Sequence, residues 1–219
     1  MDVRFEPDRD RSEDGLVPGR MFERLKGDYP NATAFPAQEL PYVADLDGVV
    51  RHRFSAEDGS RLFQVGSGVL SSNTLRYESY AVFREQVARV LEAAFGIFGS
   101  GTQSTTLRYI NKLSLGARGL GDVLSADIVG LPPGLGTVSS QRVELLLLPP
   151  DPTVGRLVVA WALPVDDEPD RLLLDLQVRQ DSRTFGDFKV LLQWLDEAHS
   201  LISSTFTSMI RTEFMESLR

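Results

Sequence analysis

The chain contains no cysteine among its 219 residues. Disulfide bonds, thiolate metal ligands and a cysteine nucleophile are therefore excluded. The reducing cytoplasm is the compartment in which we expect such a chain. Histidine is also scarce, since His52 and His199 are the only two. A zinc site would have to join both histidines to a carboxylate from elsewhere in the chain, so we expect no metal and no other cofactor.

Long apolar runs and blocks of positive charge are missing as well. The longest apolar run covers residues 157–163, far short of the ~20 residues that cross a bilayer, and residues 1–14 are too polar for a signal peptide. The formal net charge is −8. Because nonspecific nucleic-acid binding depends on neutralising phosphates, we expect no nucleic-acid partner and no membrane association.

The motifs of common enzyme classes are absent too. The glycine-rich stretches at 96–101, 116–121 and 130–136 lack the glycine and lysine pattern of a phosphate-binding loop. There is no Gly-x-Ser-x-Gly sequence, and with two histidines a serine triad has few ways to assemble. We therefore expect a protein that is not an enzyme, and we assign no catalytic residue.

What is present is the composition of a packed globular protein, with 42% hydrophobic and 25% charged residues. A chain of this length fits one large domain, because single cores stop growing only near ~250–300 residues. We expect a single α+β domain over residues 1–219. It would include a polar N-terminal segment at 1–17 and a Gly/Pro-rich loop at 116–136.

Local signals predict the order of the elements. Asp58-Gly59 supplies the positive φ of a hairpin turn between strands at 49–54 and 61–70. Ser79 is a suitable N-cap for a helix that ends near Gly96. A short N-terminal strand is expected at 3–5, a short helix at 19–26, a loop at 31–41, and further strands at 104–113, 142–148, 156–163 and 171–179. Residues 154–163 are apolar on both alternations, which predicts a central strand covered on both faces.

These elements predict a mostly antiparallel sheet of six or seven strands with helices on one face, including a long C-terminal helix. That helix is expected from residue 187 to about 218, which is ~45 Å at 1.5 Å per residue. Its apolar stripe continues through Met209, Ile210, Phe214 and Met215. We expect another chain to cover these residues, either a second copy in a homodimer or a different protein. The alternative is that the stripe folds back onto the loop at 31–41 or the N-terminal strand.

Three stretches together resemble a sporadically distributed bacterial family of uncharacterised proteins, and the resemblance spans most of the chain. They are Phe63-Gln64-Val65-Gly66 leading into Ser72-Asn73, Leu107-Arg108-Tyr109-Ile110-Asn111, and Trp194-Leu195-Asp196 followed by His199 and Phe206. The resemblance implies the fold and the boundaries and assigns no activity. A patchy distribution is typical of accessory or defence-associated genes, which is an analogy and not a mechanism.

Four residues are candidates for a ligand site. Asp196 lies one helical turn before His199 and could fix its tautomer, although a histidine among Leu195, Ile202 and Phe206 is more often a structural one bonded to a neighbouring strand. Strand alternation places Tyr109 and Asn111 on one face and Arg108 on the other. Arg108 could bind an anionic group and Asn111 could make paired hydrogen bonds, or both could be structural.

Two functions remain open at this point. The first is a non-enzymatic cytoplasmic module that binds another protein, which the missing catalytic motifs and the overlong apolar helix favour. The second is a small-molecule-binding protein that holds an apolar or anionic ligand between the sheet and the C-terminal helix.

Overall fold

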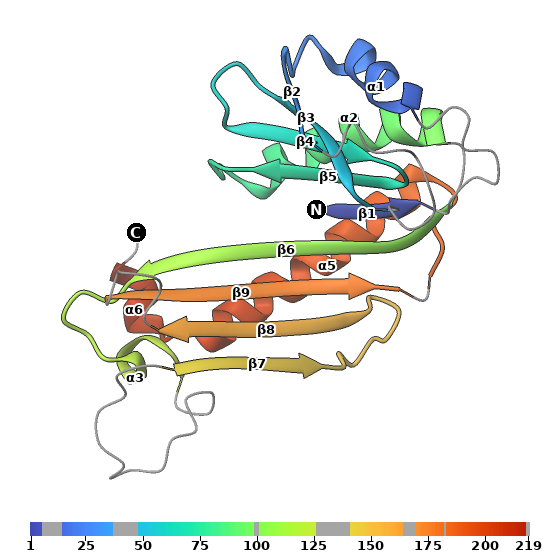
Figure 1. The fold of residues 1–219 in the computed structure, drawn as a ribbon. Coiled ribbons are helices and arrows are strands. Elements are labelled where there is room, and N and C mark those ends of the chain that lie inside the picture. The colour runs from blue at the N-terminus through green and yellow to red at the C-terminus, as the bar shows by residue number, and fades with distance from the viewer. Residues whose placement is uncertain are drawn as a thin grey trace. The chain divides into compact units, whose positions relative to one another are not determined.

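The computed structural model describes residues 1–5, 15–36, 48–98, 101–125, 141–163, 170–181 and 183–217. Nine strands follow the hydrogen-bonded order β2-β3-β4-β5-β1-β6-β9-β8-β7 in an antiparallel sheet (Figure 1). The predicted α+β class and antiparallel sheet are confirmed, and the strand count is higher than the six or seven expected. The chain divides into two compact units, of which unit 1 comprises Met1–Thr106 and Gln180–Leu195 and unit 2 comprises Leu107–Arg179 and Asp196–Arg219.

Unit 1 contains most of the N-terminal strands. They are β1 (Asp2–Phe5), β2 (Asn31–Ala34), β3 (Val50–Ser55), β4 (Arg61–Gly66), β5 (Val69–Thr74) and the start of β6 (Thr102–Ser114). The Asp58-Gly59 hairpin is confirmed, with Gly59 at φ 68°. Two strands were not predicted. β2 lies in the stretch expected to be a loop, and β5 arises because Gly68, at φ 62°, turns the chain where one long strand was expected.

Two helices of unit 1 pack against this sheet. α1 (Val17–Leu25) carries Pro18 in its first turn, and α2 (Tyr80–Phe98) follows Ser79, whose hydroxyl accepts from the amide of Val82 at 3.3 Å. The predicted cap of α2 is therefore confirmed. Phe5 of β1 stacks on Phe98 with ring centroids 4.4 Å apart. Trp194, in the first part of α5 (Phe188–Met209), is 1% exposed and completes the aromatic core of this unit beside Phe185.

Unit 2 contains the rest of β6 together with β7 (Gln141–Leu147), β8 (Arg156–Leu163) and β9 (Arg171–Gln180). Its helices are α3 (Leu120–Val123), the later part of α5, and α6 (Thr212–Ser217). Along β8 buried and half-buried residues alternate, with Leu157, Val159 and Trp161 buried. The expectation of a strand covered on both faces is wrong, because the alternate residues are alanine, valine and arginine and remain partly exposed beside the edge strand β7.

The C-terminal helix is shorter than predicted. α5 ends at Met209 after 22 residues, which corresponds to ~33 Å. Ile210 then forms an antiparallel bridge with Leu124, and the amide of Ser125 donates to the carbonyl of Met209 at 2.8 Å. These long-range backbone bonds end the helix although the apolar periodicity continues past this point.

The same segment covers the residues predicted to form an interface. Met209, Ile210 and Phe214 are 3%, 4% and 2% exposed, and Met215 is half-buried. The guanidinium of Arg118 lies 5.3 Å from the ring centroid of Phe214. Three of these four residues are therefore buried within the chain itself, where residues 118–125 contact this segment, and the expectation of a partner chain stays a prediction.

Candidate functional site

His199 meets Tyr109 inside unit 2. His199 lies on α5 and Tyr109 on β6, and the Tyr109 hydroxyl and His199 Nδ1 are 3.1 Å apart. Both side chains are half-buried. Burial lowers the pKa of His199, while Asp196 acts in the opposite direction and raises it. The imidazole is therefore neutral at pH 7, in the form that can accept from the phenol or donate to it. This geometry matches the interpretation of His199 as a structural histidine bonded to a neighbouring strand.

The other predicted ligand residues separate onto two faces of the strand, as alternation predicts. Asn111 shares the alternation of Tyr109, and its Nδ2 donates to the carbonyl of Leu174 at 3.4 Å. Arg108 is half-exposed and forms a bidentate pair with Asp175 of β9, with Nε to Oδ1 at 2.9 Å and Nη2 to Oδ2 at 2.5 Å. The structure thus brings Tyr109 to His199 and places Arg108 in an ion pair elsewhere.

The second histidine offers no metal site in the described part of the chain. His52 lies on β3 in unit 1, half-buried, and both burial and Arg51 lower its pKa. Among the described residues no group of three or more histidine, aspartate or glutamate side chains lies close enough together to hold a metal ion.

A buried polar atom of unit 2 has no hydrogen-bond partner among the described residues. This atom is Nε1 of Trp161, a residue that is 2% exposed. Trp161 pairs in register with Leu174, the residue whose carbonyl Asn111 contacts. An indole N–H without a partner is an uncommon and costly arrangement, because burial removes the water that would otherwise accept its hydrogen bond.

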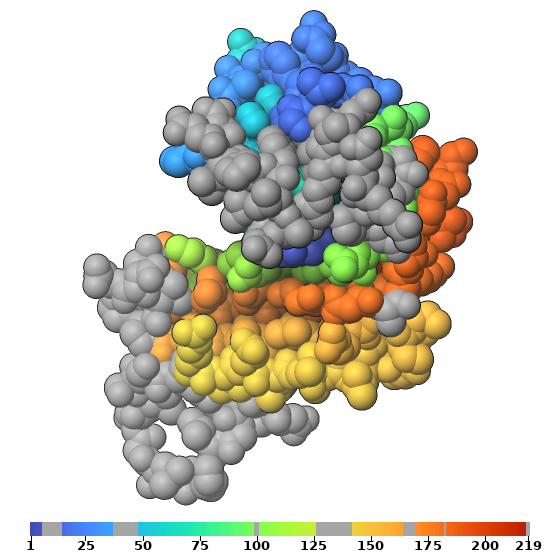
Figure 2. Space-filling model, turned by 45° about the vertical axis from the view of Figure 1, so that its right-hand side comes forward, coloured from blue at the N-terminus to red at the C-terminus, as the bar shows by residue number. Residues whose placement is uncertain are grey.

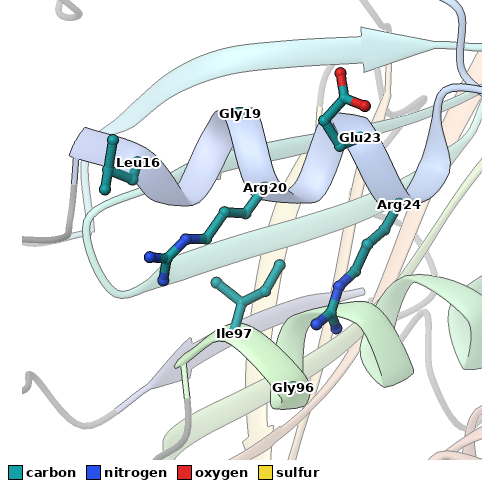
Figure 3. Close-up of a pocket in the computed structure, with 7 residues that line it drawn as sticks. All are labelled: Leu16, Gly19, Arg20, Glu23, Arg24, Gly96 and Ile97. Carbon is teal, nitrogen blue, oxygen red and sulfur yellow. The ribbon is translucent and has the colours of Figure 1, made fainter.

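A groove of about 600 Å³ lies in unit 1 between α1 and the end of α2. Figure 3 shows Arg20 and Arg24 extending from α1 toward α2 while Glu23 points away. Arg24 Nη1 donates to the carbonyl of Ala93 in the last part of α2 at 3.2 Å. Gly96 leaves room for it, since a Cβ there would lie 2.5 Å from this nitrogen. The chain itself engages Arg20 and Arg24, so neither guanidinium is reserved for a ligand.

The most exposed apolar segment of the described chain lies on β7. Strand β7 pairs with β8 on one side and is the last strand of the sheet, and Figure 2 shows it at the surface in yellow. The exposed fractions of its leucines and the one that follows are 41% for Leu145, 61% for Leu146, 42% for Leu147 and 81% for Leu148. The sequence analysis missed this feature. Four successive leucines break the alternation expected of a half-buried strand, and that signal could have found it.

Comparison with known proteins found no matching family model, no matching curated protein and no matching solved structure. The resemblance to a bacterial family therefore stays a prediction. Within the described ranges, none of the helices combines the length and the apolar character needed to cross a membrane.

Proposed function

We propose that the chain is a non-enzymatic protein-interaction module that binds another protein along the outer edge of β7, which pairs with no further strand among the described residues. The observation that carries this proposal is the exposed run Leu145–Leu148 on the last strand of the sheet. Edge strands are usually protected by charge, proline, bulges or a covering segment, because their free N–H and C=O groups pair readily with another strand. Within the part of the chain that the structure describes, the exposed run of leucines at the end of β7 has none of these protections.

The chemistry of such an edge favours an extended segment of a protein over a small ligand. Backbone hydrogen bonds would supply affinity, and the leucine side chains on alternate faces would supply contacts for specificity. Arg142 and Glu144 at the start of the strand would restrict which partners fit. The absence of cysteine and the family resemblance support the proposal that the module acts in the cytoplasm of a bacterium, and the resemblance favours a defence-associated pathway.

The candidate site in unit 2 supports this function more than an enzymatic one. His199 is paired with Tyr109 and Arg108 with Asp175, so the residues with reactive groups are engaged in structural contacts. A second function, binding of a small molecule between the sheet and α5, has one supporting observation, the Trp161 N–H without a partner among the described residues. A ligand with an acceptor beside Trp161 would satisfy it, and native mass spectrometry of the purified protein would detect that ligand by its mass.

The edge proposal is tested by photo-crosslinking in bacterial cells that express the chain. A benzophenone amino acid at position 146 should give discrete adducts of protein mass, because Leu146 is exposed at the outer edge. The matched control is position 110, where Ile110 is 55% exposed on the interior strand β6. Discrete adducts at 146 and none at 110 are expected. Equal labelling at both positions, or none at 146, would contradict the proposal.

A further inference from the structure

We propose that the protein bound at this edge is a second copy of the chain, paired antiparallel to β7 about a two-fold axis that passes through Val143. The inference rests on the proposed function of the edge and names its occupant and its register. It is carried by the charges on β7 and by what those charges face on β8.

Arg142 and Glu144 are exposed, two residues apart, and therefore on the same face of the strand. On the inner side Arg142 pairs in register with Ala162 and Glu144 with Ala160. An alanine side chain can neither accept nor donate, so β8 offers these charges no directly opposed partner. Neither residue has an ion pair among the described residues. Within the described part of the chain, no strand on the outer side of β7 pairs with either charge.

An antiparallel pairing of two identical strands has few possible registers. The residue on the two-fold axis lies opposite its own copy in the partner strand. The residue before it then lies opposite the partner's copy of the residue after it. With Val143 on the axis, Arg142 lies opposite Glu144 of the partner subunit, and Glu144 lies opposite Arg142 of the partner subunit. Each of the two strands contributes one arginine and one glutamate, so two ion pairs form and the edge is complementary to a second copy of itself.

The neighbouring registers lack this complementarity. An axis at Arg142 or at Glu144 places a charge directly opposite the same charge, which is destabilising. An axis at Leu145 places Glu144 opposite a leucine and Arg142 opposite Leu148, so both charges stay unpaired. Charge therefore selects the Val143 register over the registers that flank it.

In the Val143 register the described strand pairs with itself over residues 141–145, so Val143 and Leu145 take part in the pairing while Leu146, Leu147 and Leu148 extend past it. Val143, Leu145 and Leu147 pair in register with Trp161, Val159 and Leu157 of β8, all of which are buried. These β7 residues therefore continue the buried face of unit 2 to the edge of the sheet. In the Val143 register, Val143 packs against its own counterpart and Leu145 lies diagonal to it, which is within reach of side chains on paired strands.

The absence of cysteine allows a direct test of the register with purified full-length protein. Val143→Cys should form a disulfide-linked dimer under mild oxidation, because self-opposed residues in an antiparallel pair have Cα atoms ~4.5–5.5 Å apart. Leu145→Cys is the matched control. In the proposed register its two copies would be offset by four residues, or ~13 Å, which is too far for a disulfide. Rapid bridging at 145 and not at 143 would overturn the register.

Charge reversal gives an independent test by sedimentation equilibrium. The unmodified chain should be a dimer at micromolar concentration, and Arg142→Glu or Glu144→Arg should each raise the dimer Kd about tenfold or more. The double reversal should restore it, since the opposed pairs would again be of unlike charge. Failure of the double variant to recover would contradict the pairing.

The two proposals fail in different ways. A monomeric chain whose position 146 still crosslinks to a protein of another mass would overturn the second copy and leave the edge function standing. A monomeric chain with no adduct at position 146 would overturn both.

Discussion

Tyr109 and His199 come from positions ninety residues apart in the sequence and share a hydrogen bond of 3.1 Å that ties α5 to β6 in unit 2. The histidine is partly buried, and burial is the largest cause of its lowered pKa. A contact between a phenol and a neutral imidazole fits a half-buried position, because neither group has to be charged there.

The stability of the protein should fall as the pH decreases below the ordinary histidine pKa of 6.5. The folded-state pKa values of His199 and His52 are both lowered. Above pH 6.5 both histidines are neutral in the folded and unfolded states. Below it the unfolded chain binds protons that the folded chain resists, so the free energy of unfolding decreases. Urea denaturation at pH values from about 7.5 to 5 would measure this change in the free energy of unfolding. Most carboxylates titrate below that range. A flat profile would contradict the prediction. A variant in which both histidines are replaced should show a shallower profile that is not flat, because burial also lowers the pKa of the N-terminal amine of Met1.

Removal of the contact between Tyr109 and His199 should destabilise the chain. His199→Ala is expected to cost ~1–3 kcal/mol, through a cavity and an unpaired hydroxyl, and Tyr109→Phe about 1 kcal/mol. The double variant should lose less than the sum, because both changes remove the same hydrogen bond. Chemical denaturation of the four proteins would measure the coupling. Strictly additive losses, or an unchanged His199→Ala protein, would contradict the structural role and return His199 to the candidates for function.

The pair of Arg108 and Asp175 should contribute a small and salt-sensitive stabilisation. Arg108 is 48% exposed and Asp175 19% exposed, so solvent screens the pair. Arg108→Ala should cost about 0.5–1 kcal/mol, and less at high ionic strength. Lys112→Ala is the matched control, because Lys112 is an exposed cation on the same face of β6. The measurement is the denaturation midpoint at low and high salt, and equal effects at both positions would contradict the assignment.

Phe214→Glu should unfold or strongly destabilise the protein. Phe214 is 2% exposed and lies under Arg118, so a carboxylate there would be buried among apolar groups. The loss should exceed ~3 kcal/mol, the lower range for removing a buried phenylalanine. Leu75→Glu is the control, since Leu75 is 73% exposed and lies outside the proposed edge, so its replacement should leave the thermal midpoint nearly unchanged. A Phe214→Glu protein with full stability would restore the C-terminal stripe as an interface.

The elements that the sequence predicted are those set by neighbouring residues. Gly59 turns a hairpin and Ser79 caps α2, and both signals lie within a few positions of their effect. Strand β2 could not be predicted in this way. All four of its residues are exposed and show no apolar alternation, and the strand exists because its backbone pairs with β3, from Asn31 opposite Ser55 to Ala34 opposite His52.

In the candidate site, too, neighbouring residues determine some features and distant residues determine others. Alternation along β6 correctly separates Arg108 from Tyr109 and Asn111, because face is a local property of a strand. Which partners they meet is not local, since Asp175 and His199 arrive from other elements. The end of α5 was missed for a similar reason. The periodicity of Met209, Ile210 and Phe214 is helical, and only the backbone bonds from residues 123–125 end the helix there.

The two tryptophans of the chain give each compact unit its own fluorescent reporter. Trp194 is buried in unit 1 and Trp161 in unit 2. Replacing either one with phenylalanine would leave a single emitter, whose shift to longer wavelength on exposure to water would follow one unit alone. Coincident denaturation curves from the two variants would identify one cooperative folding domain, as the sequence predicts, and separated curves would identify two.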